Sequence, residues 1–201
     1  MQIALIDYGA GNLTSVRKGV AAAGAELVTP SRPDELARCA GMVVPGVGHF
    51  AATSSVHQAW RSAIVARVEA GVPLLGICLG MQWLFEGSAE APDVPGLGLL
   101  EGRCLRIEAE RPLKVPHVGW NSLSVIRADG ILDGVDDGTH VYFTHSYAAP
   151  LTRDCSASVI HGQAFAAVVQ RDHVAGVQFH PEKSGAAGVR ILRNFIGMTR
   201  G

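Results

Sequence analysis

The N-terminal part of the chain alternates between short apolar segments, typical of buried strands, and longer segments that carry helix start and stop signals. The predicted strands are 2–7, 26–29, 41–44 and 72–77, and the predicted helices are 13–23, 33–38 and 56–69. Strands joined by helices form parallel sheets, because the connection must return to the starting edge of the sheet. This alternation predicts an α/β fold with helices on both faces of a mostly parallel sheet.

The second half of the chain has a different pattern. Short apolar segments separated by turns follow residue 103, and they predict strands at 104–108, 123–126, 141–143, 156–161, 164–170 and 174–179, before a last helix at 188–198. Short strands joined by tight turns pair antiparallel. No repeat or linker interrupts the sequence. We therefore predict one three-layer α/β domain, residues 1–201, with a mixed, mostly parallel sheet and an antiparallel second half.

The charge balance and the ends of the chain narrow the classes of function. The 17 basic and 18 acidic residues give a formal net charge of −1, whereas nucleic-acid-binding proteins usually have a basic excess, so no nucleic-acid partner is expected. No cationic leader opens the chain, and one of its least charged segments, 72–85, is interrupted by proline and glycine. Neither secretion nor a membrane span is predicted, and a cytoplasmic location is expected.

The four cysteines are far apart, without a C-x-x-C pair, and the eight histidines are scattered. This pattern predicts reduced cysteines, no metal site and no cofactor. Only 17% of the residues are charged. A sparsely charged surface suggests that part of it is covered by another protein.

The strongest chemical signal is Gly76-Ile77-Cys78-Leu79-Gly80, between a predicted strand and a predicted helix. It has the pattern of a nucleophile elbow with cysteine in the serine position. The tight turn needs small flanking residues, which Gly76 and Gly80 provide, and a helix N-terminus favours the thiolate. A buried, inert cysteine is the alternative. The flanking glycines favour Cys78 as a nucleophile.

A cysteine nucleophile needs a base, and the base needs a group that orients it. Segment 177–182 ends an apolar strand with His180-Pro181-Glu182. Proline favours an extended residue before it, and side chains two apart in an extended chain point the same way. We expect Glu182 to hold one ring nitrogen of His180 while the other faces Cys78. Alone, such a segment is more often a strand end with a solvated carboxylate, and it gains weight only together with the elbow.

The third element is the loop Pro45-Gly46-Val47-Gly48 after the third strand. Backbone N–H groups of such a loop can stabilise a developing oxyanion. In an elbow, the N–H after the nucleophile, here that of Leu79, is the second donor. A plain turn is the alternative reading of the glycine-rich loop. Segment 9–11 is a poor dinucleotide fingerprint, because Thr14 occupies the third glycine position.

The segments 76–82 and 180–182 together resemble the class I, or triad, glutamine amidotransferases. Within that family, four further segments resemble the glutaminase subunits that work with a separate cyclase in histidine biosynthesis: 7–13, 45–50, 116–121 and 181–184. The resemblance spans essentially the whole chain, with Val118 in place of an expected methionine. It implies the flavodoxin-like three-layer fold of this family.

The resemblance also implies an activity. Cys78 would attack the carboxamide of glutamine, His180 would carry protons and Glu182 would orient His180. Backbone groups of Gly46, Val47, Gly48 and Leu79 would hold the oxyanion. The substrate's amino-acid end would be bound by Gln82, one helical turn after Cys78, and by Glu90, His145, Ser146 and Tyr147. For Glu90 a solvated acid at a helix end is the alternative, and for His145 and Tyr147 a place in the core.

A chain that releases ammonia without an acceptor site needs a partner. The resemblance implies a cyclase subunit with a (β/α)8 barrel, which would receive the ammonia and form imidazole glycerol phosphate and an aminoimidazole carboxamide ribonucleotide. Trp120, Asn121, Tyr142 and Lys183 map onto positions that face the cyclase, with Lys183 pairing with an acidic residue of the partner. Trp120 as a core aromatic and Lys183 as a solvated charge are the alternatives. Two other functions stay open: an inactive binding subunit, and a glutaminase whose partner serves pyridoxal phosphate or anthranilate synthesis.

Overall fold

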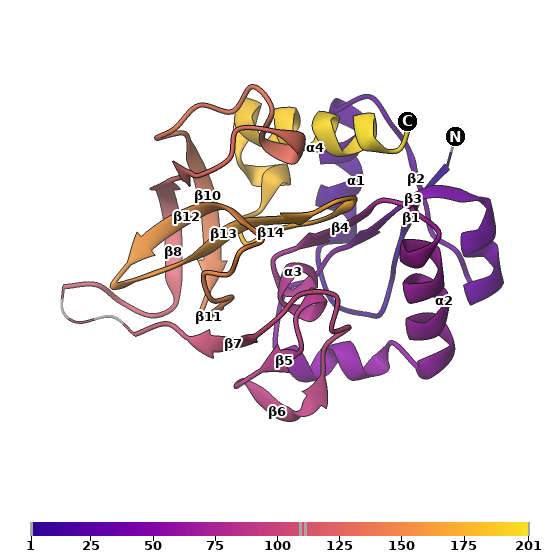
Figure 1. Ribbon diagram of the computed structural model, residues 1–201, viewed down its shortest axis with the longest axis horizontal. Coiled ribbons are helices and arrows are strands. Elements are labelled where there is room, and N and C mark those ends of the chain that lie inside the picture. The colour runs from indigo at the N-terminus through magenta and orange to yellow at the C-terminus, as the bar shows by residue number, and fades with distance from the viewer. Residues whose placement is uncertain (1, 109, 111, 201) are drawn as a thin grey trace.

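The computed structural model describes residues 2–108, 110 and 112–200. Its largest element is an eight-stranded sheet with the strand order β2-β1-β3-β4-β14-β13-β12-β9 (Figure 1). Its parallel part contains β2 (Leu27–Val28), β1 (Gln2–Leu5), β3 (Cys39–Val44), β4 (Leu74–Ile77) and β14 (Val174–Val177). Its antiparallel part continues with β13 (Gln163–Arg171), β12 (Cys155–His161) and β9 (Ser124–Val125). The predicted mixed sheet with an antiparallel second half is confirmed.

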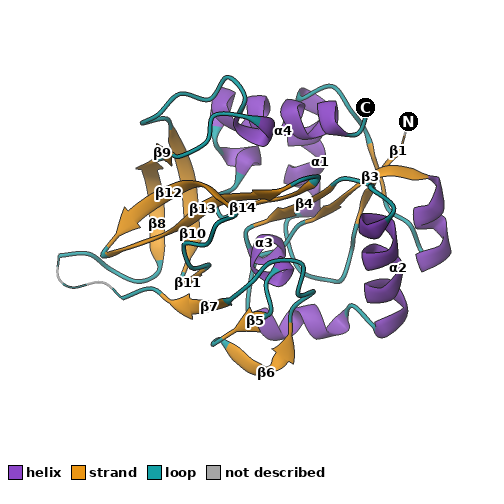
Figure 2. Cartoon of the chain, in the orientation of Figure 1, coloured by secondary structure: helices purple, strands orange, loops and turns teal. Residues whose placement is uncertain are grey.

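Helices cover both faces of this sheet. The helices α1 (Leu13–Ala22) and α4 (Gly185–Met198) lie on one face, and α2 (Gln58–Glu69) and α3 (Leu79–Leu84) lie on the other (Figure 2). Asn12 caps α1 by accepting a hydrogen bond from the Ser15 N–H, at 3.1 Å. Gly24, just beyond the end of α1, has a φ of +97°, a conformation that suits glycine. The predicted beginning and end of this helix are thus confirmed to within a residue.

Two smaller sheets lie beside the main one. In the first, β8 (His117–Ser122) pairs antiparallel with β10 (His140–His145). The second has the order β11-β7-β5-β6, with bounds Tyr147–Ala148, Arg103–Arg106, Gly87–Ser88 and Ala91–Pro95. The strands β5, β6, β8 and β11 were not predicted. These strands are very short or contain proline or glycine, so they carry little period-two signal.

Four segments form 3-10 helices: η1 (Pro33–Arg38), η2 (Phe50–Ser55), η3 (Gly130–Leu132) and η4 (Pro181–Lys183). The short helix predicted at 33–38 is present as a 3-10 helix with the same bounds, and the helix predicted at 56–69 begins at Gln58, after η2. Among the described residues, no helix is long and apolar enough to cross a membrane.

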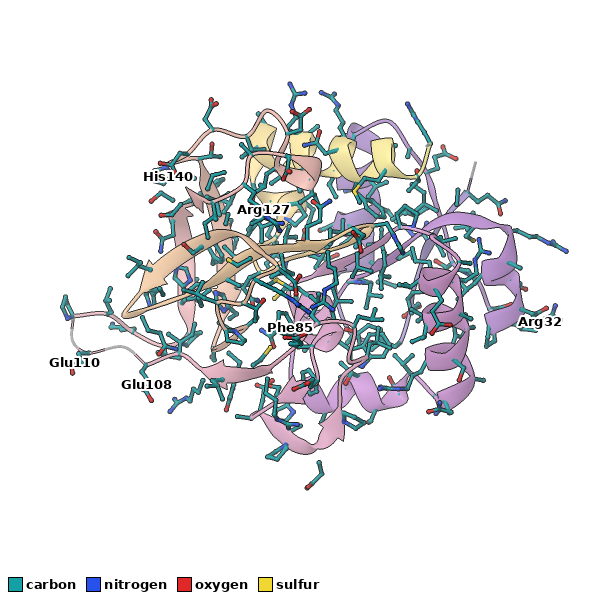
Figure 3. The ribbon with its side chains drawn as sticks, in the orientation of Figure 1. Arg32, Phe85, Glu108, Glu110, Arg127 and His140 are labelled. Carbon is teal, nitrogen blue, oxygen red and sulfur yellow. The ribbon has the colours of Figure 1, made fainter. Side chains whose placement is uncertain are left out.

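The core has one apolar cluster on each face of the main sheet. Along β1, Ile3 and Leu5 belong to the cluster beneath α1 and α4, whereas Ala4 belongs to the other cluster. Successive strand residues point to opposite faces, so a strand buried on both faces is apolar throughout. Phe85, which is fully buried, lies in the interior, whereas Arg32 and Glu110 lie at the periphery (Figure 3).

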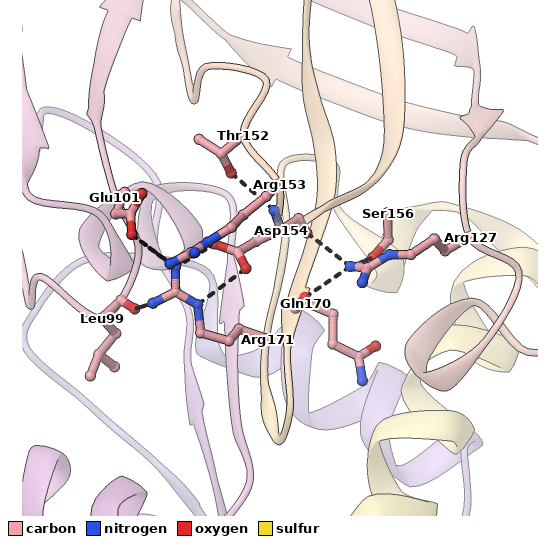
Figure 4. Close-up of polar contacts among 9 residues, drawn as sticks. All are labelled: Leu99, Glu101, Arg127, Thr152, Arg153, Asp154, Ser156, Gln170 and Arg171. Carbon is pink, nitrogen blue, oxygen red and sulfur yellow. Dashed lines mark hydrogen bonds and ion pairs between the residues drawn. The ribbon is translucent and has the colours of Figure 1, made fainter.

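A network of charged side chains ties the antiparallel strands to the loop after β6 (Figure 4). Arg171 makes two hydrogen bonds to the nearly buried Asp154, from Nε to Oδ1 at 3.1 Å and from an amino group to Oδ2 at 2.6 Å. Its other amino group donates to the Leu99 carbonyl at 3.0 Å. Two parallel bonds between arginine and carboxylate fix geometry as well as charge. This pair holds β12 and β13 against the loop that precedes β7.

Candidate active site

Cys78 lies at the sharp turn between β4 and α3, with φ of +52° and ψ of −108°. Such a conformation is strained for a residue with a Cβ atom. A Cβ on Gly76 would lie 2.6 Å from the Gly80 carbonyl oxygen, and a Cβ on Gly80 would lie 1.9 Å from the Val44 carbonyl oxygen. Both glycines are therefore required by close backbone contacts. The predicted elbow geometry is present.

His180 follows the end of β14 and pairs with Glu182. The ring Nδ1 lies 2.9 Å from Glu182 Oε1, and the two side chains are only 2% and 3% exposed. The predicted contact is present, but the extended path assumed for residues 180–182 is wrong. Residues Pro181–Lys183 form η4 instead, and this tight turn folds Glu182 back toward the ring of His180.

The charge state of His180 follows from its surroundings. Burial lowers the pKa of His180, but hydrogen bonding to Cys78 and Glu182 and the negative charge of both groups raise it to about 9. Within the described residues, Nε2 is buried and has no hydrogen-bond partner apart from this contact to Cys78. An imidazolium beside a cysteine favours the nucleophilic thiolate.

The predicted oxyanion loop lies directly over the elbow. Glycine is needed at position 46, because a Cβ on Gly46 would lie 2.2 Å from the Tyr8 hydroxyl and 2.8 Å from Leu79 Cβ. The Tyr8 hydroxyl donates to the Pro45 carbonyl at 2.7 Å. The Leu79 N–H, expected to be a free oxyanion donor, instead donates to the Gly46 carbonyl at 3.3 Å. The Leu79 N–H, one of the predicted oxyanion donors, is therefore already hydrogen-bonded to the loop in this structure.

A cavity of about 210 Å³ opens beside Cys78. It brings together the predicted nucleophile, part of the predicted oxyanion loop and all five predicted substrate-binding residues. Its lining residues are Val47, Gly48, Cys78, Leu79, Gln82, Glu90, Pro116, Thr144, His145, Ser146 and Tyr147. Glu90 accepts the Phe50 N–H at 2.7 Å, so its carboxylate also holds the end of the oxyanion loop. Pro116 and Thr144 were not predicted as site residues.

Buried hydrogen bonds fix the far wall of this cavity. The Tyr147 carbonyl accepts from Gln82 Nε2 at 2.7 Å and lies 2.9 Å from His145 Nδ1. His145 Nε2 lies 3.1 Å from Nδ1 of His117, whose ring stacks on His161 with centroids 4.1 Å apart. Burial lowers the pKa of His145 to about 3 and that of His117 to about 4. Both rings are therefore neutral at physiological pH.

Neutral rings make the direction of the hydrogen bonds unambiguous. A carbonyl can only accept, so His145 donates from Nδ1 to Tyr147 and accepts at Nε2 from His117 Nδ1. His117 Nε2 then accepts from Asn121 Nδ2 at 3.3 Å. Asn121 also donates to the Ile160 carbonyl at 3.1 Å. Asn121, predicted to face a partner, thus has its amide group engaged within the chain.

The other three residues predicted to face a partner lie together. Trp120 is 56% exposed, and its ring meets that of Tyr142 edge-on across the β8–β10 pair, with centroids 6.0 Å apart. Lys183 Nζ lies 5.7 Å from the centre of the Tyr142 ring. We call Trp120, Tyr142 and Lys183 the aromatic patch. An exposed tryptophan in such a cluster is typical of protein interfaces.

The fold and the site define a thiol hydrolase with a Cys-His-Glu arrangement on a nucleophile elbow. No group of three or more histidine, cysteine, aspartate or glutamate side chains placed to hold a metal ion is found in the described part of the chain.

Comparison with known proteins supports this class. The family profile "Glutamine amidotransferase class-I" matches residues 4–198. A protein of Gloeobacter violaceus, "Imidazole glycerol phosphate synthase subunit HisH", is 48% identical over 96% of this chain and 88% of its own length. The protein of the same description from Geobacillus thermodenitrificans is 45% identical over 99% and 97%. The chain therefore belongs to the class I glutamine amidotransferase family, and within it to the HisH subunits of imidazole glycerol phosphate synthase.

Solved structures support the fold. A structure described as "Crystal structure of glutamine amidotransferase" has a TM-score of 0.76 at 20% identity, over 98% of this chain and 99% of that one. The "Structure of PurLQS from Thermotoga maritima" has a TM-score of 0.74 at 16% identity, over 98% and 97%. The predicted family and its fold are confirmed.

Proposed function

We propose that this chain is the glutaminase subunit of an imidazole glycerol phosphate synthase and that it releases ammonia from glutamine. The observation that carries the proposal is the cavity at Cys78, whose walls combine a nucleophile, an oxyanion loop and polar groups suited to an amino acid. The identity to HisH subunits over nearly the whole chain supports the same function.

In the proposed mechanism, the Cys78 thiolate attacks the carboxamide carbon of glutamine. The oxyanion accepts hydrogen bonds from backbone N–H groups of Gly46–Gly48. The Leu79 N–H becomes a further donor once its hydrogen bond to the Gly46 carbonyl breaks. The His180 imidazolium protonates the departing nitrogen and the C–N bond breaks. Ammonia is released, and a glutamyl thioester remains on Cys78. Neutral His180 then takes a proton from water, which attacks the thioester and releases glutamate. Glu182 holds His180 in place throughout.

The amino-acid end of glutamine is assigned to the other wall of the cavity. The Gln82 Nε2 protons are used on Tyr147 and Gln178, so Gln82 offers its Oε1 to the substrate ammonium. Glu90 offers a second acceptor. His145, Ser146 and Tyr147 complete this end of the cavity. Carboxylate and amide oxygens suit an ammonium group because both accept hydrogen bonds.

The proposed partner is a cyclase subunit with a (β/α)8 barrel, in a heterodimer. The relatives are described as subunits of a synthase, and ammonia needs an acceptor protected from water, because the ammonium ion is not nucleophilic. The aromatic patch is the proposed docking surface, with Lys183 pairing with an acidic residue of the cyclase. A cytoplasmic location is part of the proposal.

Glutamate release from the chain alone, and from the chain with the cyclase and its nucleotide, tests this function. We expect release to be slow alone and fast in the loaded complex, and Cys78→Ala to abolish it without unfolding the protein. Equal, fast turnover in both states would refute the need for a partner. Absence of Cys78 labelling by a glutamine-like electrophile would instead favour an inactive binding subunit.

A further inference from the structure

Gln178 is a buried polar residue that the mechanism above does not use. It follows β14, two residues before His180, and its side chain is completely buried. An amide group in such a place costs free energy unless its polar atoms are hydrogen-bonded. Its partners therefore indicate why a glutamine is placed there.

The partners of Gln178 are Cys78 and Gln82. Gln178 Nε2 lies 3.6 Å from Cys78 Sγ, and Gln178 Oε1 lies 3.1 Å from Gln82 Nε2. The orientation of both amides follows from the Tyr147 carbonyl. Because that carbonyl can only accept, Gln82 presents its NH₂ group there, and the same NH₂ group requires the oxygen of Gln178. Gln178 must then direct its N–H groups at the sulfur.

We infer that Gln178 is a positioning residue for Cys78, and that its amide N–H holds the thiolate sulfur in place between the cavity and the base. This inference rests on the proposed role of Cys78 as the nucleophile. An N–H donor bonds more strongly to a charged acceptor than to a neutral one, so it favours the thiolate over the thiol. The hydrogen bonds that link Tyr147, Gln82 and Gln178 prevent the Gln178 amide from turning its oxygen toward the sulfur.

The backbone supports the same placement. The Cys78 N–H donates to the Val177 carbonyl at 2.8 Å, and the Gln178 N–H donates to the Ala167 carbonyl at 2.8 Å. Cys78 and Gln178 are thus fixed to each other through β14 as well as through their side chains. Gln178 is absent from the cavity lining, so it acts on the sulfur and not on the bound substrate.

The test compares Gln178→Glu and Gln178→Leu with the unchanged protein. Gln178→Glu keeps the size and the acceptor for Gln82 but places a carboxylate oxygen at the sulfur, whereas Gln178→Leu removes the donor. Gln170→Leu is the matched control, because Gln170 hydrogen-bonds Ile131 and Asp172 and takes no part in the site. The rate of Cys78 alkylation by chloroacetamide is followed by mass spectrometry from about pH 5 to about pH 10.

We expect alkylation at neutral pH to slow about ten-fold in Gln178→Glu and about three-fold in Gln178→Leu, with the profile shifted to higher pH. In the complex with the cyclase, kcat for glutamine should fall by similar factors at little-changed KM. The titratable groups around Cys78 are His180 with Glu182, Tyr8, His145 and Glu90, and all are kept in these variants.

An alkylation profile unchanged in both variants would overturn the inference, even if stability falls. Failure of Cys78 to react with a glutamine-like electrophile in the unchanged protein would instead overturn the proposed function. A measurement on the unchanged chain avoids any dependence on folding of the variants. The side-chain amide resonances of Gln178 should shift as Cys78 ionises and stay constant with pH in Cys78→Ala, and constant resonances in both proteins would also refute the inference.

Discussion

Gly80→Ala tests whether the elbow is held by backbone contact. The added Cβ would lie 1.9 Å from the Val44 carbonyl oxygen, whereas real Cβ contacts essentially never fall below 3.0 Å. The helix α3 must therefore move away from β3 by about 1.1 Å. Neither side can yield by rotating a side chain, because Val44 and Gly80 are both buried and the contact is with the backbone.

The cost of this movement can be estimated. Overpacking a core costs about 1–3 kcal/mol, and a clash with a backbone oxygen belongs at the upper end, about 3 kcal/mol. For a chain of this size, each kcal/mol lowers Tm by about 2–4 °C, so a fall of roughly 6–12 °C is expected. Displacing α3 also shifts Leu79 and Cys78, and glutaminase activity in the complex should fall at least about ten-fold, since misplacement by 1 Å can cost about 10²-fold.

Gly197→Ala is the matched control with the opposite expectation. Gly197 lies near the end of α4, has no atom within 4 Å of an added Cβ and does not have a positive φ. Alanine there should stabilise the protein by about 0.5–1 kcal/mol, because glycine loses more backbone entropy in a helix. Thermal and urea unfolding measure both variants. A Gly80→Ala protein with unchanged Tm and full activity would refute the close-contact explanation of the elbow.

Three further predictions follow from single contacts. Cys78 and Glu182 together raise the pKa of His180 to about 9, and Glu182→Gln removes the contribution of the Glu182 charge, so an NMR titration should show a lower pKa. The raised pKa stabilises the folded state fully below about pH 6.5 and progressively less up to about pH 9, so the variant should lose stability at about pH 6 and little at about pH 10. Cys78→Gly should be more stable than Cys78→Ala by about 1 kcal/mol in urea unfolding, because glycine tolerates a φ of +52°; equal stabilities would refute strain at the elbow. Arg171→Met should lower the free energy of unfolding by about 2 kcal/mol, because it leaves the Asp154 carboxylate unpaired. The double variant with Asp154→Leu should recover part of that loss. A loss below about 0.5 kcal/mol in Arg171→Met would contradict this expectation.

The parallel half of the fold was predictable because its strands are buried on both faces. Such strands are apolar throughout, and the helices between them have clear ends, as Asn12 and Gly24 illustrate. The β8 strand was not predictable, because its sequence contains Gly119 and follows Pro116, and only His117 among its residues is buried. Its pairing with β10 is decided by contacts between distant parts of the chain, which local propensity does not encode.

The candidate site was predictable to the extent that chemistry marks its residues. The glycines that flank Cys78 indicate a nucleophile elbow, the segment with His180 and Glu182 gains weight only beside that elbow, and the structure places the three residues together. Gln178 was missed although it carried a signal: it is a polar residue within a buried apolar strand segment, which requires specific partners. The engagement of Leu79 with Gly46 could not be predicted, because it depends on how a loop settles over the elbow.

The position of β10 connects the proposed docking surface with His180, the proposed catalytic base. Tyr142 presents its ring to the aromatic patch, while its backbone carbonyl accepts the His180 N–H at 2.9 Å and its N–H donates to the Ser184 hydroxyl at 3.0 Å. Ser184 in turn donates to the His180 carbonyl at 2.6 Å. Because the same strand ends at His145 in the cavity wall, any displacement of β10 changes the anchoring of the base and the shape of the substrate pocket together. A protein bound at Tyr142 would therefore contact a strand that anchors His180 and also reaches the cavity.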